Sequence, residues 1–298
     1  MSYTKFRQAN DKVTFARKNV LVVGGTSGIG AAVAIRFAEL GANVIIAGRN
    51  KDAADKVMDK MTAVGYEKGN TFSFVPVDVS LIADVKRFAA EFKPIDHKLH
   101  VLILSAGGIG GGPRKETKEG LEKNFAINCS GRFLLINLLL PSLQAGGGRV
   151  LDILAAGKGA PIDVDDLELK RDYSTSKSMA RNALFNDVLV KELAVRYPDV
   201  AFHHLFPGLV KTDVLTNSNL PSCVFCALGA IYAIGGTSPE KYAEAVVYAS
   251  WDSKFGTEHS GRLVGPKLQD VKPVPFASDK NAIDRIWTYS INVTGMKS

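Results

Sequence analysis

The chain has 298 residues, 46% of them hydrophobic, and a formal net charge of +7. This length suffices for one large α/β domain, and no Pro-, Gly- or Ser-rich linker and no internal repeat divides it, so we expect a single domain over residues 1–298. Its lysines and arginines are scattered and lack the basic run with interleaved aromatic residues that nucleic-acid binding needs, so we expect no nucleic acid as a partner.

The first 18 residues are polar and of mixed charge, without the apolar segment of a secretion signal. The chain has three cysteines, an odd number that is typical of a protein in the reducing cytoplasm. Cys223 and Cys226 form a C-x-x-C pattern, but no second pair accompanies them. We therefore interpret them as buried thiols and expect a cytoplasmic protein without a metal site.

An apolar run at 20–23 predicts a strand buried on both faces, and a glycine-rich turn follows it directly. Glycine adopts positive φ and lets another backbone approach, so such a turn can present its N–H groups and the positive end of the next helix to a pyrophosphate. A helix over 29–40, ended by Gly41, and a second apolar run at 44–47 complete a βαβ unit.

The glycine spacing, G-x-x-x-G-x-G, resembles the nucleotide-binding turn of the short-chain dehydrogenase/reductase family. The alternative is a glycine-rich turn of another α/β protein, which accounts neither for the flanking strands nor for the helix end. The resemblance implies a nicotinamide dinucleotide bound by Gly24, Thr26, Ser27, Gly28, Ile29 and Gly30.

The second strand ends in Ala47-Gly48-Arg49-Asn50, where a carboxylate would bind the ribose diol of NAD. Arg49 instead offers a planar cation suited to a 2′-phosphate, so with Asn50 beside it we expect NADP(H) as the cofactor. The alternative for Arg49 is a solvated surface arginine.

A helix over 51–64 and a third strand over 71–78 come next. The resemblance implies that Asp78 and Val79, at the end of this strand, contact the adenine. Asp78 also suits the N-cap of a helix around 83–92, with Ser80 as a rival cap. A fourth strand, 100–104, leads to the turn beside the cofactor ribose, where the family usually has Asn-Ala-Gly and this chain has Ser105, Ala106 and Gly107.

A strongly apolar helix is predicted over 134–140, with Asn128 before it. By resemblance, Asn128 is the family's asparagine, whose local kink lets a water bridge the backbone and the catalytic lysine. An ordinary core amide with satisfied hydrogen bonds is the alternative.

The fifth strand, 149–154, ends at Ala155, where the family normally carries a serine that binds the substrate carbonyl and steadies the catalytic tyrosine. Alanine has no side-chain donor. Either a water, the substrate itself or Lys158 holds the oxygen, or the chemistry is not ordinary carbonyl reduction. The insert that follows, 158–172, carries acidic residues whose spacing matches no metal loop, so we expect a solvated loop.

Tyr173 and Lys177 are four residues apart on a helix predicted to run to Ala194, so we expect them on one face. An isolated phenol has a pKa of about 10, and a nearby ammonium favours its phenolate. The pattern Y-x-x-x-K is common by chance, but its position after the fifth strand matches the catalytic pair of the family. In the family the lysine also binds the nicotinamide ribose, so both residues are assigned to catalysis and to the cofactor.

The sixth strand, 200–206, ends in a turn that resembles the family's Pro-Gly segment at the nicotinamide and phosphates, here Pro207, Gly208, Val210 and Thr212. A substrate lid is expected at about 213–237. Its apolar stretch at 222–234 is too short to span a membrane, and it could be a core helix, a membrane-surface patch or a lid over an apolar substrate. A helix over 239–249 and a last strand over 260–265 follow. The tail after Lys267 has no readable signature.

These observations predict a doubly wound α/β Rossmann fold with a parallel sheet of about seven strands. The resemblance implies an NADP(H)-dependent oxidoreductase that reduces a ketone, or oxidises a secondary alcohol, on an apolar small molecule, with Tyr173 as acid/base and Lys177 and Asn128 in support. Glu119-Gly120, the apolar 133–140 helix and the insert resemble the retinol-dehydrogenase-like and fungal biosynthetic branches, which points to secondary metabolism.

Two other functions stay open. Ala155 motivates a redox-neutral isomerase, dehydratase or cyclase on the same scaffold, and a nucleotide-sensing protein without turnover comes from a different class. The helices at 133–140 and after Tyr173 form the pair that commonly makes dimer interfaces in the family, so the resemblance implies a homodimer or homotetramer.

Overall fold

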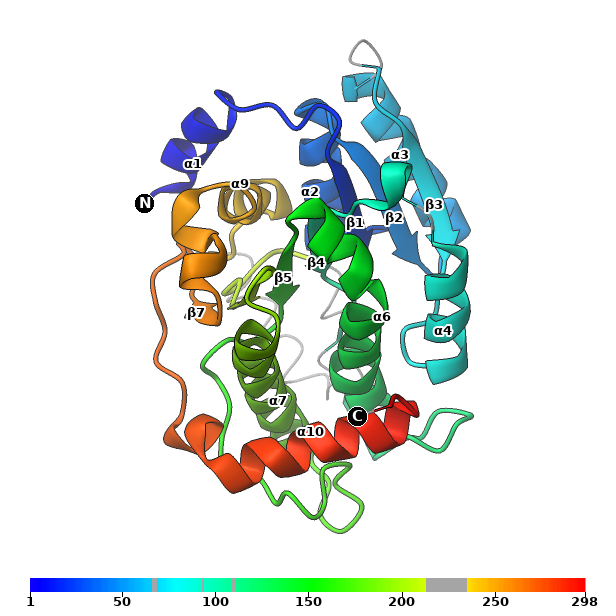
Figure 1. Ribbon diagram of the computed structural model, residues 1–298, viewed down its shortest axis with the longest axis vertical. Coiled ribbons are helices and arrows are strands. Elements are labelled where there is room, and N and C mark those ends of the chain that lie inside the picture. The colour runs from blue at the N-terminus through cyan, green and yellow to red at the C-terminus, as the bar shows by residue number, and fades with distance from the viewer. Residues whose placement is uncertain (66–68, 93, 109–110, 213–234, 298) are drawn as a thin grey trace.

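The computed structural model describes residues 1–65, 69–92, 94–108, 111–212 and 235–297. Seven parallel strands form one sheet in the order β3-β2-β1-β4-β5-β6-β7 (Figure 1). Their bounds are β1 Asn19–Val23, β2 Asn43–Gly48, β3 Phe72–Pro76, β4 Val101–Leu104, β5 Arg149–Ile153, β6 Ala201–Leu205 and β7 Arg262–Val264. This is the predicted doubly wound α/β fold.

Strand β1 is an interior strand of the sheet, and every one of its side chains is buried. It pairs with β2 on one side and β4 on the other, with Val20 in register with Val44 and Val101. The chain order reverses between β1 and β4, and open parallel sheets bind ligands at the carboxyl ends of the strands beside such a reversal. The site is therefore expected beyond Val23 and Leu104.

Successive residues of β1 supply two separate cores, because side chains alternate between the faces of a strand. Val20 and Val22 belong to one hydrophobic cluster, with helices α2 (Gly28–Glu39), α3 (Lys51–Gly65) and α9 (Pro239–Ala249). Leu21 and Val23 belong to the other, with helices α4 (Ile82–Glu91), α6 (Gly131–Gly146) and α7 (Thr175–Arg196). Each face of the sheet is thus covered by helices.

The chain begins with a helix that the sequence analysis did not predict, α1 (Tyr3–Asn10). Its Asn10 amide donates to the carboxylate of Glu244 in α9 at 2.8 Å, and Arg36 of α2 pairs with the same carboxylate at 3.1 Å. Phe6 is buried against Tyr248, with their ring centroids 5.0 Å apart. Helix α1 therefore belongs to the core, although its sequence is polar.

Helix α5 (Lys123–Phe125), a π-helix (Ala126–Ser130) and α6 run on without a break. By length and composition this segment, Lys123–Gly146, is the one helix of the described residues that could cross a membrane, with a mean hydropathy of 1.3. However, 72% of its most apolar window is buried inside the fold. Core packing therefore accounts for its apolar character.

The tail after Lys267 also forms an unpredicted helix, α10 (Lys280–Thr294), which crosses α6 and α7 (Figure 1). Its Trp287 packs edge-on against Phe133 of α6, with ring centroids 5.2 Å apart, and Arg196 of α7 lies 4.0 Å from the Trp287 ring. Short helical turns complete the described elements: 3-10 helices at Ile95–His97, Ser253–Phe255, Thr257–His259 and Pro275–Ser278.

Candidate active site

The glycine-rich turn folds back tightly on the sheet. A Cβ added at Gly24 would stand 2.3 Å from the backbone nitrogen of Ala106, and one added at Gly30 would stand 2.1 Å from the Gly24 carbonyl oxygen. Gly24 also has φ +84°, a conformation that L side chains rarely adopt. The turn is thus a backbone cradle, which any side chain at these two positions would fill.

The first turn of α2 faces this cradle with little side-chain capping. Ser27 occupies the N-cap, yet its side chain makes no capping hydrogen bond. Thr212, from the turn after β6, lies against Gly28, since its Cγ2 would stand 3.1 Å from a Cβ there. Thr26 lies against Gly48 in the same way, at 3.1 Å, and Ile29 is half-buried in the helix start. A helix N-terminus with free N–H groups suits a phosphate.

Arg49 and Asn50 follow β2 at the edge of the cradle. Arg49 is exposed, and its guanidinium has no hydrogen-bond or ion-pair partner in the part of the chain that the structure describes. Asn50 has a structural role, because its Oδ1 accepts the N–H of Ala53 at 3.0 Å in the first turn of α3. Arg49 is therefore free to bind an anion.

Neither Asp78 nor Ser80 caps α4, so the predicted capping is wrong. Asp78 instead accepts from the Ser80 N–H at 3.0 Å and the Ser80 hydroxyl at 2.7 Å. The first N–H groups of α4 are bound by the Glu119 carboxylate, which accepts from Ala83 N at 3.0 Å. Val79, next to Asp78, lines a small cavity beside Ala106.

The turn after β4, residues 105–107, contacts both the glycine-rich cradle and Asn128. The N–H groups of Ser105 and Ala106 both donate to the Val23 carbonyl at 2.8 Å. A Cβ added at Gly107 would stand 2.7 Å from Asn128 Oδ1. The structure thus places three of the predicted segments together, namely the glycine turn, the 105–107 turn and Asn128.

Asn128 lies in the π-helix and is fully buried. Its Nδ2 donates to the carbonyls of Asn124 at 3.0 Å and Gly108 at 3.4 Å, and its own carbonyl accepts from Asn186 at 2.9 Å. Its Oδ1 is buried and has no partner among the described residues. This orphaned acceptor needs a donor from outside the described chain, as a water relay or a cofactor group would provide.

Arg132 is a site residue that the sequence analysis missed. It is buried in α6, forms an ion pair with Asp152 of β5, and donates to the carbonyls of Ala106 at 2.7 Å and Ile153 at 3.1 Å. It therefore ties together the ends of β4 and β5. The sequence feature that could have identified Arg132 is its position as a single charge at the start of an apolar helix.

Tyr173 does not lie on the same helix face as Lys177, contrary to the prediction. Helix α7 begins at Thr175, because the Ser174 hydroxyl caps it by accepting the Lys177 N–H at 3.2 Å. Tyr173 precedes the cap, and its phenolic oxygen accepts from Asn124 Nδ2 at 3.2 Å. The Lys177 ammonium forms an exposed ion pair with Asp172 instead.

The segment that follows β5 is held in place by a buried histidine–aspartate pair. The Ala155 N–H donates to His204 Nε2 at 3.1 Å, and His204 Nδ1 lies 2.7 Å from Asp187 Oδ1. Asp187 also accepts the Gly157 N–H at 3.2 Å. Lys158, one of the expected replacements for the missing serine, lies 5.2 Å from the centroid of the Phe206 ring.

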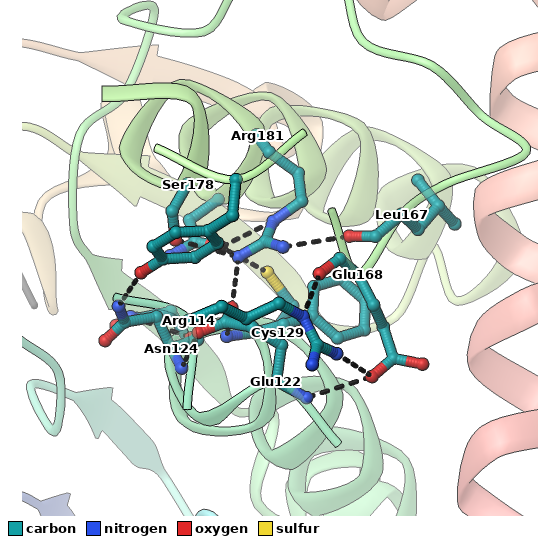
Figure 2. Close-up of polar contacts among 12 residues, drawn as sticks. Arg114, Glu122, Asn124, Cys129, Leu167, Glu168, Ser178 and Arg181 are labelled. Atoms are coloured by element: carbon teal, nitrogen blue, oxygen red, sulfur yellow. Dashed lines mark hydrogen bonds and ion pairs between the residues drawn. The ribbon is translucent and has the colours of Figure 1, made fainter. Parts of the chain in front are cut away.

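The 158–172 insert is more than a solvated loop, which corrects the prediction. Glu168 is buried, and its carboxylate accepts from the Glu122 N–H at 2.9 Å (Figure 2). It also accepts from the Tyr289 hydroxyl of α10 at 2.7 Å. Burial alone would raise the pKa of Glu168, but these hydrogen bonds outweigh it and lower the pKa. The insert thus joins α10 to the core.

The turn after β6 carries the last predicted cofactor residues. Gly208 has φ +71° and lies against Pro266, and Val210 pairs with Thr237. Pro207 begins this turn, two residues after β6 ends at Leu205. Residues 213–234 of the predicted lid, with Cys223, Cys226 and the apolar stretch, lie outside the described residues.

Other reactive groups are scarce in the described chain. No group of three or more His, Cys, Asp or Glu side chains is placed there to hold a metal ion. Cys129 is fully buried, and burial raises the pKa of its thiol. Such burial disfavours the thiolate, which is the nucleophilic form of cysteine.

Several known proteins are similar to this chain. A family model described as short chain dehydrogenase matches residues 18–221. Polyprenol dehydrogenase of Mus musculus is 29% identical over 92% of this chain and 83% of its own length, and retinol dehydrogenase 13 of Homo sapiens is 28% identical over 96% and 87%. A crystal structure of an uncharacterized protein from Mycobacterium paratuberculosis has a TM-score of 0.74 at 24% identity and covers 97% of each chain.

Proposed function

This chain belongs to the short-chain dehydrogenase family, and from that premise we propose that it is an NADP(H)-dependent oxidoreductase that reduces a ketone, or oxidises the matching secondary alcohol, on an apolar small molecule. The observation that carries the proposal is the backbone cradle at Gly24 and Gly30, which lies against the 105–107 turn and leads to Asn128. A dinucleotide would be held by its pyrophosphate in this cradle, and by the resemblance its nicotinamide would lie toward Tyr173.

Arg49 supports NADP(H) over NAD(H). It is an exposed guanidinium at the end of β2, without a partner in the described ranges of the chain. The ribose of an adenine nucleotide is bound beside the end of this strand in such folds, and an arginine there accommodates a 2′-phosphate. A planar guanidinium binds phosphate through two parallel hydrogen bonds.

The nicotinamide supplies a hydride to the carbonyl carbon when it is bound. Tyr173 donates its phenolic proton to the oxygen, which becomes the alcohol, and Asn128 holds the proton relay through its unpartnered Oδ1. The role proposed for Lys177 requires its ammonium to leave Asp172 and turn toward Tyr173. Both members of that ion pair are more than half exposed, so separating them costs little, about 1 kcal/mol or less.

An apolar substrate is supported by the relatives and by the site. The two relatives are named as dehydrogenases of polyprenol and retinol, which are apolar alcohols. Leu209, in the turn after β6, is 41% exposed beside the predicted nicotinamide contacts. A role in secondary metabolism and a cytoplasmic location with contact to a membrane surface complete the proposal.

We propose that the α6 and α7 surface is not the interface of a homodimer or homotetramer, in contrast to the expectation from the family. The pair α6 and α7, which the resemblance assigns to the interface, has α10 lying across it, with Trp287 between Phe133 and Arg196. We propose that the chain's own C-terminal helix takes the place of the partner on this face. Any homo-oligomer then uses another surface.

The test of the proposed function is a fluorescence titration with NADPH and NADH, followed by addition of cyclic ketones, quinones and retinoid-like carbonyls in the same cuvette. We expect stronger binding of NADPH, and a decay of its emission with one class of carbonyl. Binding without decay against every carbonyl would favour the redox-neutral alternative. No binding of either nucleotide would refute the cofactor assignment.

A further inference from the structure

The strand end at Ala155 offers no free donor to a substrate oxygen. Its side chain is a methyl group, and its N–H is already bound to His204 Nε2 at 3.1 Å. A carbonyl oxygen gains negative charge as hydride adds to its carbon, and losing one preorganised donor to that charge costs on the order of 10² to 10³ in rate. A working reductase therefore needs a donor from another element.

Asn124 is placed to be this donor. Its Nδ2 lies 3.2 Å from the phenolic oxygen of Tyr173, and no other described side chain makes a hydrogen bond to that oxygen. An amide nitrogen carries two hydrogens, so one can bind the phenolic oxygen while the other binds a substrate oxygen beside it. By the resemblance, a serine at position 155 binds the substrate carbonyl and steadies the tyrosine, and the Asn124 amide could fill both roles.

The backbone of Asn124 is held on both sides, which fixes where its side chain starts. Its N–H donates to Glu122 Oε1 at 2.8 Å, and its carbonyl accepts from Asn128 Nδ2 at 3.0 Å. The second bond links Asn124 directly to the predicted relay residue. A donor on such a fixed backbone loses little conformational entropy when substrate binds.

A buried network stands behind Asn124 (Figure 2). Glu122 and Arg181 are 1% and 0% exposed and form an ion pair at 2.7 Å. Arg181 also donates to the Leu167 carbonyl at 2.9 Å, and Glu168 accepts the Glu122 N–H at 2.9 Å. The network anchors the turn that carries Asn124 to both α7 and the insert.

We propose that Asn124 is a catalytic residue, whose side-chain amide binds the phenolic oxygen of Tyr173 and the reacting oxygen of the substrate in place of the serine hydroxyl that Ala155 lacks. The substrate contact rests on the proposed function. The contact with Tyr173 does not, so the two are tested separately.

The contact with Tyr173 is tested without cofactor, by carbon-13 NMR of protein labelled at tyrosine Cζ. The Tyr173 signal is the one that disappears in Tyr173→Phe. We expect the chemical shift of this signal to change in Asn124→Leu and in Asn124→Asp. The second variant keeps the size of the side chain but replaces the amide donor by a carboxylate. Asn137→Leu is the matched control, because this amide lies on the same continuous helix and, among the described residues, binds only the Phe133 carbonyl, at 2.7 Å. A Tyr173 signal that stays in place in the folded Asn124 variants overturns the inference, whatever the reaction.

The substrate contact is tested by kinetics with NADPH and a ketone that the wild type reduces. We expect Asn124→Leu to lower kcat on the order of 10²-fold with KM little changed, since the bond strengthens mainly in the transition state. Ala155→Ser should then restore kcat at least tenfold in the Asn124→Leu background and change it about threefold or less in the wild type, because both residues fill one role. An equal gain in both backgrounds, or an unchanged kcat in Asn124→Leu, overturns the assignment. If the wild type reduces no ketone, the proposed function fails and the NMR result alone decides the Tyr173 contact.

Discussion

Gly24 lies so close to Ala106 that a Cβ at position 24 would stand 2.3 Å from the Ala106 nitrogen. This approach brings the turns after β1 and β4 together and shapes the cradle for a pyrophosphate. The cradle is made of backbone, and it can hold a pyrophosphate only because Gly24 and Gly30 have no side chains to fill it. The proposed nucleotide site therefore depends on this contact.

Replacing Gly24 by alanine should abolish NADPH binding and destabilise the fold. The added methyl meets backbone, and φ +84° is strained for alanine, so the loss of unfolding free energy should exceed about 1 kcal/mol. Gly147→Ala is the control, because Gly147 has φ +59° with nothing within 4 Å of its Cβ position. Equal losses of stability and unchanged NADPH binding in the two variants would show that the contact does not shape the site.

Replacing Arg49 by glutamine should weaken NADPH binding at least tenfold, because a hydrogen bond to a charged group contributes about 1.5–3 kcal/mol. NADH has no 2′-phosphate, so its affinity should stay the same. Fluorescence titration with both nucleotides measures the difference. Lys51→Gln removes a neighbouring exposed cation that pairs with Asp55, and it should affect both nucleotides equally. An equal loss for NADPH and NADH in Arg49→Gln would identify Arg49 as an ordinary surface arginine.

Replacing Arg181 by leucine should lower the unfolding free energy by about 3–5 kcal/mol, since it leaves the buried Glu122 carboxylate without its partner. Arg171→Leu removes a guanidinium that is 65% exposed and pairs with Asp163 and Asp166, and it should cost about 1 kcal/mol or less. Urea denaturation of both variants gives the comparison. A similar small cost for both would mean that the network behind Asn124 does not hold the turn.

Acid should destabilise the protein through His203. Burial lowers the pKa of this imidazole to about 4, partly offset by its hydrogen bond to the Phe255 carbonyl at 3.0 Å. The unfolded chain then binds more protons than the fold, so the contribution of His203 is full above pH 6.5 and is lost as the pH falls toward 4. Between pH 7 and pH 5 the wild type should lose roughly 2 kcal/mol more unfolding free energy than His203→Gln. Equal losses in urea titrations at the two pH values would contradict this.

The outer surface of α7 should not be a dimer interface. Val195 is an apolar residue of α7 that is 78% exposed, so a charge there would break any dimer built on this helix. We expect Val195→Glu to have the same mass as the wild type by light scattering. A wild-type dimer that dissociates in Val195→Glu would restore the interface expected from the family.

The sheet and the cofactor turn could be predicted because local patterns determine them. Buried parallel strands appear as apolar runs, and a backbone cradle appears as glycines at fixed spacing. The sequence of α10 hid its packing, because two of its four buried positions are polar. Ser290 and Thr294 satisfy their hydroxyls on the carbonyls of Ile286 and Ser290, at 2.7 and 2.6 Å.

The catalytic arrangement was harder to predict. Ser174 is a good N-cap, and recognising it would have placed Tyr173 before the helix. No local pattern predicts that Asn124 meets Tyr173, because the two are 49 residues apart in the chain. The same holds for the burial of Glu168, whose partners come from α10 and from the turn before α5. Such contacts are set by the tertiary fold.

The most direct test of the central claim is the transfer of deuterium from NADPH labelled at C4 of the nicotinamide, with a ketone that consumes the cofactor. We expect the alcohol to carry the label at its carbinol carbon, transferred from one face of the nicotinamide ring only. Tyr173→Phe should form little of this alcohol while still binding NADPH. A product without label, formed equally well by Tyr173→Phe, would show that the cofactor does not give hydride to the substrate.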